Sequence, residues 1–247
     1  MKKKNIQKLE KLAELQNQII RITRKIYKRD IQLFKEIFAL LLKIVDTAKT
    51  KWGGNREDKF LDSYLILTNK IISDLQGCYL LWERGLYGTA FAIVAVMLRS
   101  QRMLAALHFK PSLAERYLNE ERNDFFLDKN FQKIFSERNL QKIIDAQFGE
   151  NGRTDLEKSL HGSAWGSRKY YGKIYRDEKG LKSAELTFAP FFEPEKSAGI
   201  IKIIQASCLD IVGIYLEKYQ RDKNVITYEE EYKRLLRETT GCSQIKP

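Results

Sequence analysis

Hydrophobic residues recur every three or four positions along the first fifty residues, which is the spacing of one face of an α-helix. The first stripe has a mean spacing of 3.4 residues and consists of Leu9, Leu12, Leu15, Ile19, Ile22 and Ile26. This spacing is close to the 3.5 residues of a coiled-coil seam. A similar stripe continues from Ile31 to Val45. The pattern predicts one long helix, or two helices broken near Asp30.

Further helices are predicted downstream, at about 58–82, 89–107, 112–122, 130–134, 139–148, 154–161, 195–220 and 228–237. The segment 89–107 contains the longest apolar run, nine residues from Ala90 to Leu98. A bilayer-spanning helix needs roughly twenty apolar residues. We therefore expect 89–107 to be a central core helix with neighbours on nearly all sides, and we expect no membrane span.

Residues 163–195 interrupt the helical pattern. They hold two of the four prolines, and Ile174-Tyr175 and residues 185–188 flank a polar turn at Asp177–Gly180, which is typical of a small hairpin. The expected fold class is therefore all-α: a multi-helix bundle with a long basic N-terminal helical arm and a small irregular or hairpin insertion near 165–192. We divide the chain into residues 1–50, a basic amphipathic or coiled-coil arm, and residues 51–247, the bundle.

Charge is the strongest compositional signal. The 247 residues include 44 Lys and Arg against 32 Asp and Glu, a formal net charge of +12. Residues 1–30 alone carry ten cations and three acids. Clustered cations bind phosphates by releasing counterions, so the arm predicts nucleic-acid binding. The candidate contacts are Lys4, Lys8, Lys11, Arg21, Arg24, Lys25, Lys28 and Arg29. The alternative is the solvated face of a coiled coil that oligomerises or grips an acidic helical protein partner.

A second candidate surface follows at Trp165–Lys182, where rings and cations alternate. Its candidate nucleic-acid contacts are Arg168, Lys169, Tyr170, Tyr171, Lys173 and Arg176. Such a mixture suits stacked bases and backbone phosphates. The same rings would equally well close an open end of the bundle.

Two arginines lie in the most apolar helix. Arg99 and Arg102 are three residues apart and share a helix face, and buried guanidinium groups must be paired or line a cavity. One interpretation is an anion site inside the bundle. The favoured one is a structural ion pair with an acid such as Glu83 or Asp210, or a helix that emerges into solvent. At the end of the same helix we expect His108 to cap or pack.

Catalytic chemistry has few candidates. The chain has 3 Cys and 2 His without paired ligand spacing, so we expect neither a metal site nor a cofactor. The scattered, odd cysteine count favours a reducing cytoplasm. The cluster from Ser159 to Trp165 contains His161, an imidazole able to act as general base or acid near neutral pH. The favoured alternative is that His161 caps a helix C-terminus.

The pairing of Leu98-Arg99 with Ser159-Leu160-His161-Gly162-Ser163 resembles a group of uncharacterised bacterial helical proteins with a Leu-Arg core helix and a hydrophobic-His-Pro/Gly-Ser segment. The general arrangement is also similar to the HEPN superfamily of helical nucleotide-binding and ribonuclease domains. Their usual mark is Arg, four to six residues, then His, and the nearest match here is Arg153 to His161 with seven between. The resemblance implies a role beside mobile elements or in phage defence.

These observations favour a cytoplasmic, basic, helical protein that binds nucleic acid, RNA or a nucleoprotein assembly rather than a DNA operator, because no helix-turn-helix pattern is present. Any enzymatic activity would be that of a HEPN-like, metal-independent ribonuclease. In it His161 would act on a 2′-hydroxyl, and Arg153, or Arg99 and Arg102, would stabilise the phosphorane. The third hypothesis is a coiled-coil adaptor that forms a homo-oligomer or binds a protein partner through the N-terminal helix.

Overall fold

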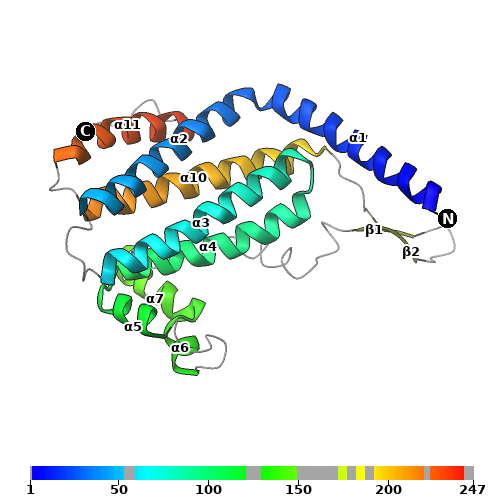
Figure 1. Cartoon of the computed structure of the whole chain (residues 1–247). Helices are drawn as coiled ribbons and strands as arrows, with labels where there is room; N and C mark the ends of the chain where they lie inside the picture. The colour runs from blue at the N-terminus through cyan, green and yellow to red at the C-terminus, as the bar shows by residue number, and fades with distance from the viewer. Residues whose placement is uncertain are drawn as a thin grey trace. The chain divides into compact units, whose positions relative to one another are not determined.

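The computed structural model of the chain describes residues 2–52, 59–120, 129–148, 172–176, 182–186, 192–219 and 223–241. The α-helices in these residues are α1 (Lys2–Ile26), α2 (Lys28–Thr47), α3 (Lys59–Glu83), α4 (Tyr87–Phe109), α5 (Ser112–Glu120), α6 (Lys129–Ile134), α7 (Glu137–Phe148), α10 (Pro194–Lys218) and α11 (Lys223–Thr240). A π-helical turn, Ala48–Trp52, follows α2. The all-α prediction is therefore confirmed (Figure 1). The helix predicted at 154–161 lies outside the described residues.

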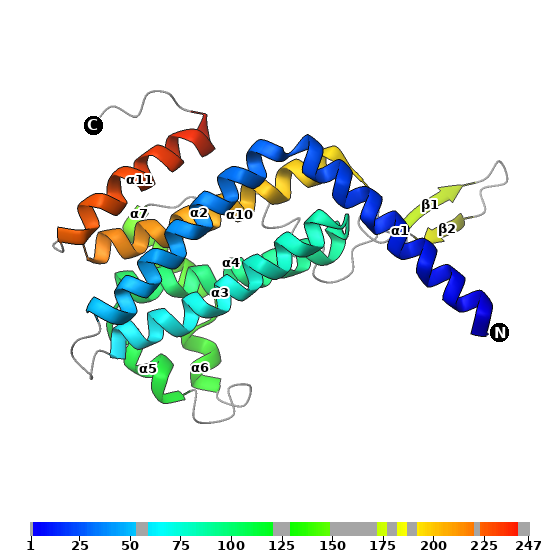
Figure 2. The same ribbon diagram turned by 45° about the horizontal axis from the view of Figure 1, so that its top comes forward.

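The predicted hairpin insertion is also present. Strands β1 (Gly172–Arg176) and β2 (Lys182–Leu186) pair antiparallel, with Gly172 opposite Leu186 and Arg176 opposite Lys182 (Figure 2). Five residues separate the strands, and the predicted turn at Asp177–Gly180 falls among them, outside the described residues. The insertion is therefore a short two-stranded ribbon.

The N-terminal stripe forms two helices rather than one, and the junction is Tyr27. Backbone hydrogen bonding continues through it, because Tyr27 N donates to Thr23 O and Ile31 N donates to Tyr27 O, both at 2.9 Å. The Tyr27 ring is buried edge-on against Trp82, with 5.7 Å between ring centroids. The hydroxyl of Tyr27 donates to the Pro194 carbonyl at 2.8 Å. This anchored ring lies at the junction, where α1 ends at Ile26 and α2 begins at Lys28.

The backbone divides into two compact units. The first comprises Met1–Gln32, Leu75–Ala95 and Arg153–Ile204, and the second comprises Leu33–Asp74, Val96–Gly152 and Gln205–Pro247. Each unit combines residues from both sides of position 50. The two units are therefore a different division from the arm and bundle expected from the sequence. The expected boundary between residues 50 and 51 stays a prediction.

The core of the first unit is built around Trp82. This indole is fully buried, and its Nε1 donates to the Ser197 carbonyl at 2.8 Å, which joins α3 to the start of α10. Ile19, Ile31 and Cys78 are buried in the same unit. Burial of so large a side chain with its one polar atom satisfied is a strong anchor.

The core of the second unit contains a cluster of aromatic rings. Tyr64 and Tyr215 are fully buried and meet edge to face at 5.8 Å. The hydroxyls of Thr68 and Tyr215 are 3.0 Å apart, so the buried polar atom of Tyr215 is satisfied. Desolvation raises the pKa of both tyrosines, which keeps them neutral hydrogen-bonding groups.

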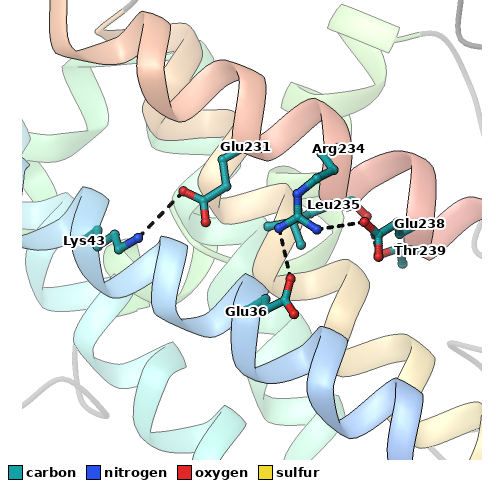
Figure 3. Close-up of polar contacts among 7 residues, drawn as sticks. All are labelled: Glu36, Lys43, Glu231, Arg234, Leu235, Glu238 and Thr239. Carbon is teal, nitrogen blue, oxygen red and sulfur yellow. Dashed lines mark hydrogen bonds and ion pairs between the residues drawn. The ribbon is translucent and has the colours of Figure 1, made fainter.

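Helix α11 is held on this second unit by a buried side chain, by the Tyr228 hydroxyl 2.9 Å from that of Thr47, and by a rim of ion pairs. Leu235 is fully buried. Figure 3 shows the guanidinium of Arg234 reaching Glu36 of α2 at 2.9 Å and Glu238 of its own helix at 2.7 Å, with Lys43 lying 3.8 Å from Glu231. Exposed ion pairs contribute about 1 kcal/mol or less each, so the rim adds little to the attachment beside the buried contacts.

Helix α4 is the predicted core helix, but neighbours do not surround it. Val94, Met97 and Leu104 are buried, whereas Val96 is 49% exposed and Arg99 is exposed. By length and composition α4 and α10 would each suffice to cross a membrane, and half or more of the most apolar window of each is buried inside the protein. Buried core helices satisfy the same criterion, so the absence of a membrane span stays a prediction.

Candidate nucleic-acid interface

The basic face of α1 continues across Tyr27 onto α2. Arg21 and Lys25 lie one turn apart on one side of α1, about 6 Å along its axis, and Arg29 follows at the same four-residue interval in the first turn of α2. Lys11 and Lys28 are also exposed on these helices. We call these five residues the basic face.

None of the five side chains of the basic face forms an ion pair or a side-chain hydrogen bond with another described residue. Asp30, the neighbouring acid, instead pairs with Lys202 at 3.0 Å. Glu10 and Glu14 are exposed on the same helix. The face therefore presents cations that internal acids leave available for an external anion.

Arg24 lies on the same helix but serves the fold. Its Nε donates to Oε1 of Glu83 at 2.6 Å and its Nη2 donates to Oε2 at 3.3 Å. The Glu83 side chain is only 5% exposed. The hydrogen bond to Glu83 and its charge raise the pKa of Arg24. The side chain that the sequence assigned to the nucleic-acid face thus neutralises a buried carboxylate. The side chains of Lys4 and Lys8 lie outside the described part, although both residues belong to α1.

The predicted coiled-coil seam is only partly closed. Ile19 is buried, but Leu15, Ile22 and Ile26 are 36%, 42% and 56% exposed. An exposed apolar stripe on one helix is typical of a surface that packs against a partner. It runs beside the basic face, so the two hypotheses for the arm use adjacent strips of one helix.

The two arginines of α4 are in different surroundings. Arg99 is exposed, whereas Arg102 is 16% exposed and its Nη1 lies 3.8 Å from Oε1 of Glu137. The acids named from the sequence have other partners, because Glu83 binds Arg24 and Asp210 accepts a 2.7 Å hydrogen bond from Gln101. The structural ion pair thus forms, but with Glu137 of α7.

His108 is a packing residue with two polar contacts. Its Nδ1 is 2.9 Å from the Tyr64 hydroxyl and its Nε2 is 3.3 Å from a carboxylate oxygen of Glu217. The imidazole therefore joins a buried phenol of α3 to an acid at the end of α10. Within the described residues, no group of three or more His, Cys, Asp or Glu is arranged to hold a metal ion.

For the remaining sequence candidates, the structure describes only the backbone or nothing at all. Lys173 and Arg176 lie on β1, and only their backbone positions are described. The catalytic candidates Arg153 and His161 lie outside the described residues, as do Arg168, Lys169, Tyr170 and Tyr171. Their assigned roles stay predictions.

Sequence reasoning missed a basic pocket in the second unit. Its volume is about 920 Å³, and it is lined by Arg116, Lys133, Ile134, Ser136, Arg138, Asn139 and Lys142. The four cations span 27 positions and alternate in sequence with acids such as Glu115 and Glu137. The only local signal is the four-residue spacing of Arg138 and Lys142 on α7.

Comparisons with protein-family models, curated proteins and solved structures found no match. The resemblance to helical bacterial proteins and to HEPN domains therefore stays a prediction.

Proposed function

We propose that the protein binds nucleic acid, with RNA favoured, through the basic face formed by Lys11, Arg21, Lys25, Lys28 and Arg29. The observation that supports this function is that all five cations are exposed and that no described acid pairs with them. Between Arg21 and Arg29 no acid interrupts the cations, whereas charges kept only for solubility would be expected to be interspersed with acids. The ordered spacing along a helix suits a chain of phosphates.

The proposal makes a quantitative prediction about salt. Neutralising one phosphate of a single strand contributes about −0.7 to the slope of log K against log salt concentration. Four such contacts would give a slope of about −3, and affinity would fall roughly 50-fold between 50 and 200 mM salt.

The test is binding of the full chain to labelled single-stranded RNA, duplex RNA and duplex DNA by fluorescence anisotropy over a salt series. The variant carries Arg21→Gln, Lys25→Gln, Lys28→Gln and Arg29→Gln. The matched control loses the same charge at the exposed residues Lys35, Lys49, Lys110 and Arg237. Gln keeps the helix propensity of Lys and Arg. A slope lowered by about 3 in the first variant only supports the proposal, and equal behaviour of the two variants refutes it.

A second candidate function, a coiled-coil adaptor, is favoured by the exposed side chains of Leu15, Ile22 and Ile26. It predicts self-association or capture of an acidic helical partner. Sedimentation equilibrium of the full chain and of the Leu15→Gln/Ile22→Gln/Ile26→Gln variant tests it. An oligomer that dissociates in the variant supports the adaptor. A monomer in both, with salt-dependent RNA binding, favours the nucleic-acid proposal alone.

The ribonuclease alternative rests on residues outside the described part of the chain. The same RNA samples test it directly: cleavage products that disappear in His161→Ala would add catalysis to binding, and intact RNA at every salt concentration would remove this alternative.

A further inference from the structure

Figure 1 shows α5, α6 and α7 as three short green helices close together, and the basic pocket lies among them. Arg116 comes from α5, Lys133 from α6, and Arg138 and Lys142 from α7. All four side chains are exposed to solvent. The pocket is therefore an open concavity whose walls carry four positive charges.

The pocket has a defined frame. Asn139 Nδ2 donates to the Ile134 carbonyl at 3.0 Å, which ties the start of α7 to the end of α6. The Ser136 hydroxyl donates to the Lys133 carbonyl at 3.0 Å. The rings of Tyr117 and Phe135 meet edge to face at 6.0 Å, which joins α5 to the turn between α6 and α7. The cations thus project from elements that contact one another.

No described acid lining the pocket offsets its charge. None of the four cations pairs with a described residue, and no carboxylate is among the described lining residues. Glu137, the acid at the first position of α7, lies 3.8 Å from Arg102 of α4 and does not line the pocket. Ser136 precedes α7, and its carbonyl oxygen accepts a hydrogen bond from the backbone N–H of Leu140 at 2.9 Å. The pocket therefore also includes the start of a helix, where the partial charge is positive.

We propose that this pocket binds a small ligand that carries a chain of two or more phosphate groups. Ligand pockets typically have volumes of roughly 300–1,000 Å³, and this one lies in that range at about 920 Å³. Four cations match a multiply charged anion better than a single phosphate. Ile134 is the one apolar residue among the described lining, so charge rather than an apolar surface provides recognition. This inference is independent of the proposed function, which uses other residues.

The test is isothermal titration calorimetry of the full chain with inorganic triphosphate in metal-free buffer at low salt. The expected result is saturable, one-to-one binding. The Arg138→Gln/Lys142→Gln variant is expected to bind about tenfold more weakly, because each exposed charge pair contributes up to about 1 kcal/mol. The matched control, Lys35→Gln/Lys49→Gln, loses the same charge from exposed positions that do not line the pocket. Circular dichroism checks that helix content is unchanged.

A nucleoside triphosphate, titrated in parallel, identifies the source of the phosphate chain. Tighter binding than inorganic triphosphate supports a nucleotide ligand, and equal binding supports a site that needs phosphate alone. The proposal is overturned if triphosphate does not saturate, or if the control loses as much affinity as the pocket variant. It is also overturned if triphosphate binding is lost only when Arg21, Lys25, Lys28 and Arg29 are replaced. Because that variant separately tests RNA binding, failure of one proposal is distinguishable from failure of the other.

Discussion

Arg24 and Glu83 form a two-pronged ion pair, with Nε 2.6 Å from Oε1 and Nη2 3.3 Å from Oε2. The carboxylate is almost fully buried, while the Arg24 side chain remains 64% exposed. One surface cation of the arm therefore satisfies an acid of α3 within the first unit. Arg24 therefore has a structural role, whereas the cations of the basic face have no described partner. The two roles can be distinguished by measuring stability and RNA affinity separately.

Replacing Arg24 should reduce stability more than RNA affinity. Arg24→Met leaves Glu83 buried without its main partner, and we expect a loss of about 1–3 kcal/mol in the free energy of unfolding, measured by urea denaturation. The double variant with Glu83→Gln should lose less than the sum of the two single variants, because the interaction is shared. Arg21→Met, on the same helix but exposed, is the control and should change stability by less than about 0.5 kcal/mol. Equal losses at the two positions would contradict a structural role for Arg24.

The contact between His108 and Tyr64 provides a second test in the other unit. The Tyr64 hydroxyl is fully buried and 2.9 Å from His108 Nδ1. His108→Leu removes one of its hydrogen bonds and should lower the free energy of unfolding by about 1–3 kcal/mol. The double variant His108→Leu/Tyr64→Phe should recover part of that loss, since no buried hydroxyl then lacks this partner. Strict additivity of the two single changes would show that the contact contributes nothing.

The helices were predictable because their signal is local. Three- and four-residue spacing identified α1, α2 and α10, and an apolar run identified α4. The position of the first helix break was less predictable. The sequence placed it near Asp30, but the junction is Tyr27, whose ring packs against Trp82, 55 positions along the chain. A long-range contact of this kind leaves no mark in the spacing of one helix.

Side-chain partners were mostly not predictable. Arg102 pairs with Glu137, 35 positions away, rather than with Glu83 or Asp210, the two acids named as examples from the sequence. The basic pocket requires Arg116, Lys133 and Arg138 to converge through the packing of three short helices. Each of these cations stands near acids in the sequence, so local charge counts hide them. A cluster that is contiguous in sequence, such as the basic face, is by contrast visible at once.

Asp210 should make stability depend on pH between about 4 and 6. Although part of its side chain is exposed, crowding by protein atoms raises its pKa from 3.8 to about 6, against the opposing effect of the hydrogen bond from Gln101. Between these pH values the folded state therefore holds a proton that the unfolded state has released. The contribution of protonated Asp210 to the free energy of unfolding is fully present below pH 4 and is lost as pH rises through 6. Asp210→Asn should consequently gain stability relative to the wild type between pH 4.5 and pH 7. An unchanged difference between the two proteins would show that Asp210 titrates normally, and an NMR titration of its carboxyl carbon gives the value directly.

Two glycines of α10 allow a matched test of packing against helix propensity. At Gly199 an added Cβ would meet nothing within 4 Å, whereas at Gly213 it would lie 3.0 Å from Oη and 3.6 Å from Cζ of Tyr232 on α11. Alanine is favoured over glycine in a helix interior by about 0.5–1 kcal/mol, so Gly199→Ala should raise the free energy of unfolding by that amount. For Gly213→Ala, the Tyr232 ring must first move by a few tenths of an ångström. This movement costs about 1 kcal/mol or more and offsets the gain in helix propensity. Urea denaturation of both variants measures the difference. Equal stabilisation at the two positions would show that α11 moves freely at Tyr232, while stabilisation at Gly199 alone would show that α10 and α11 are in firm contact there.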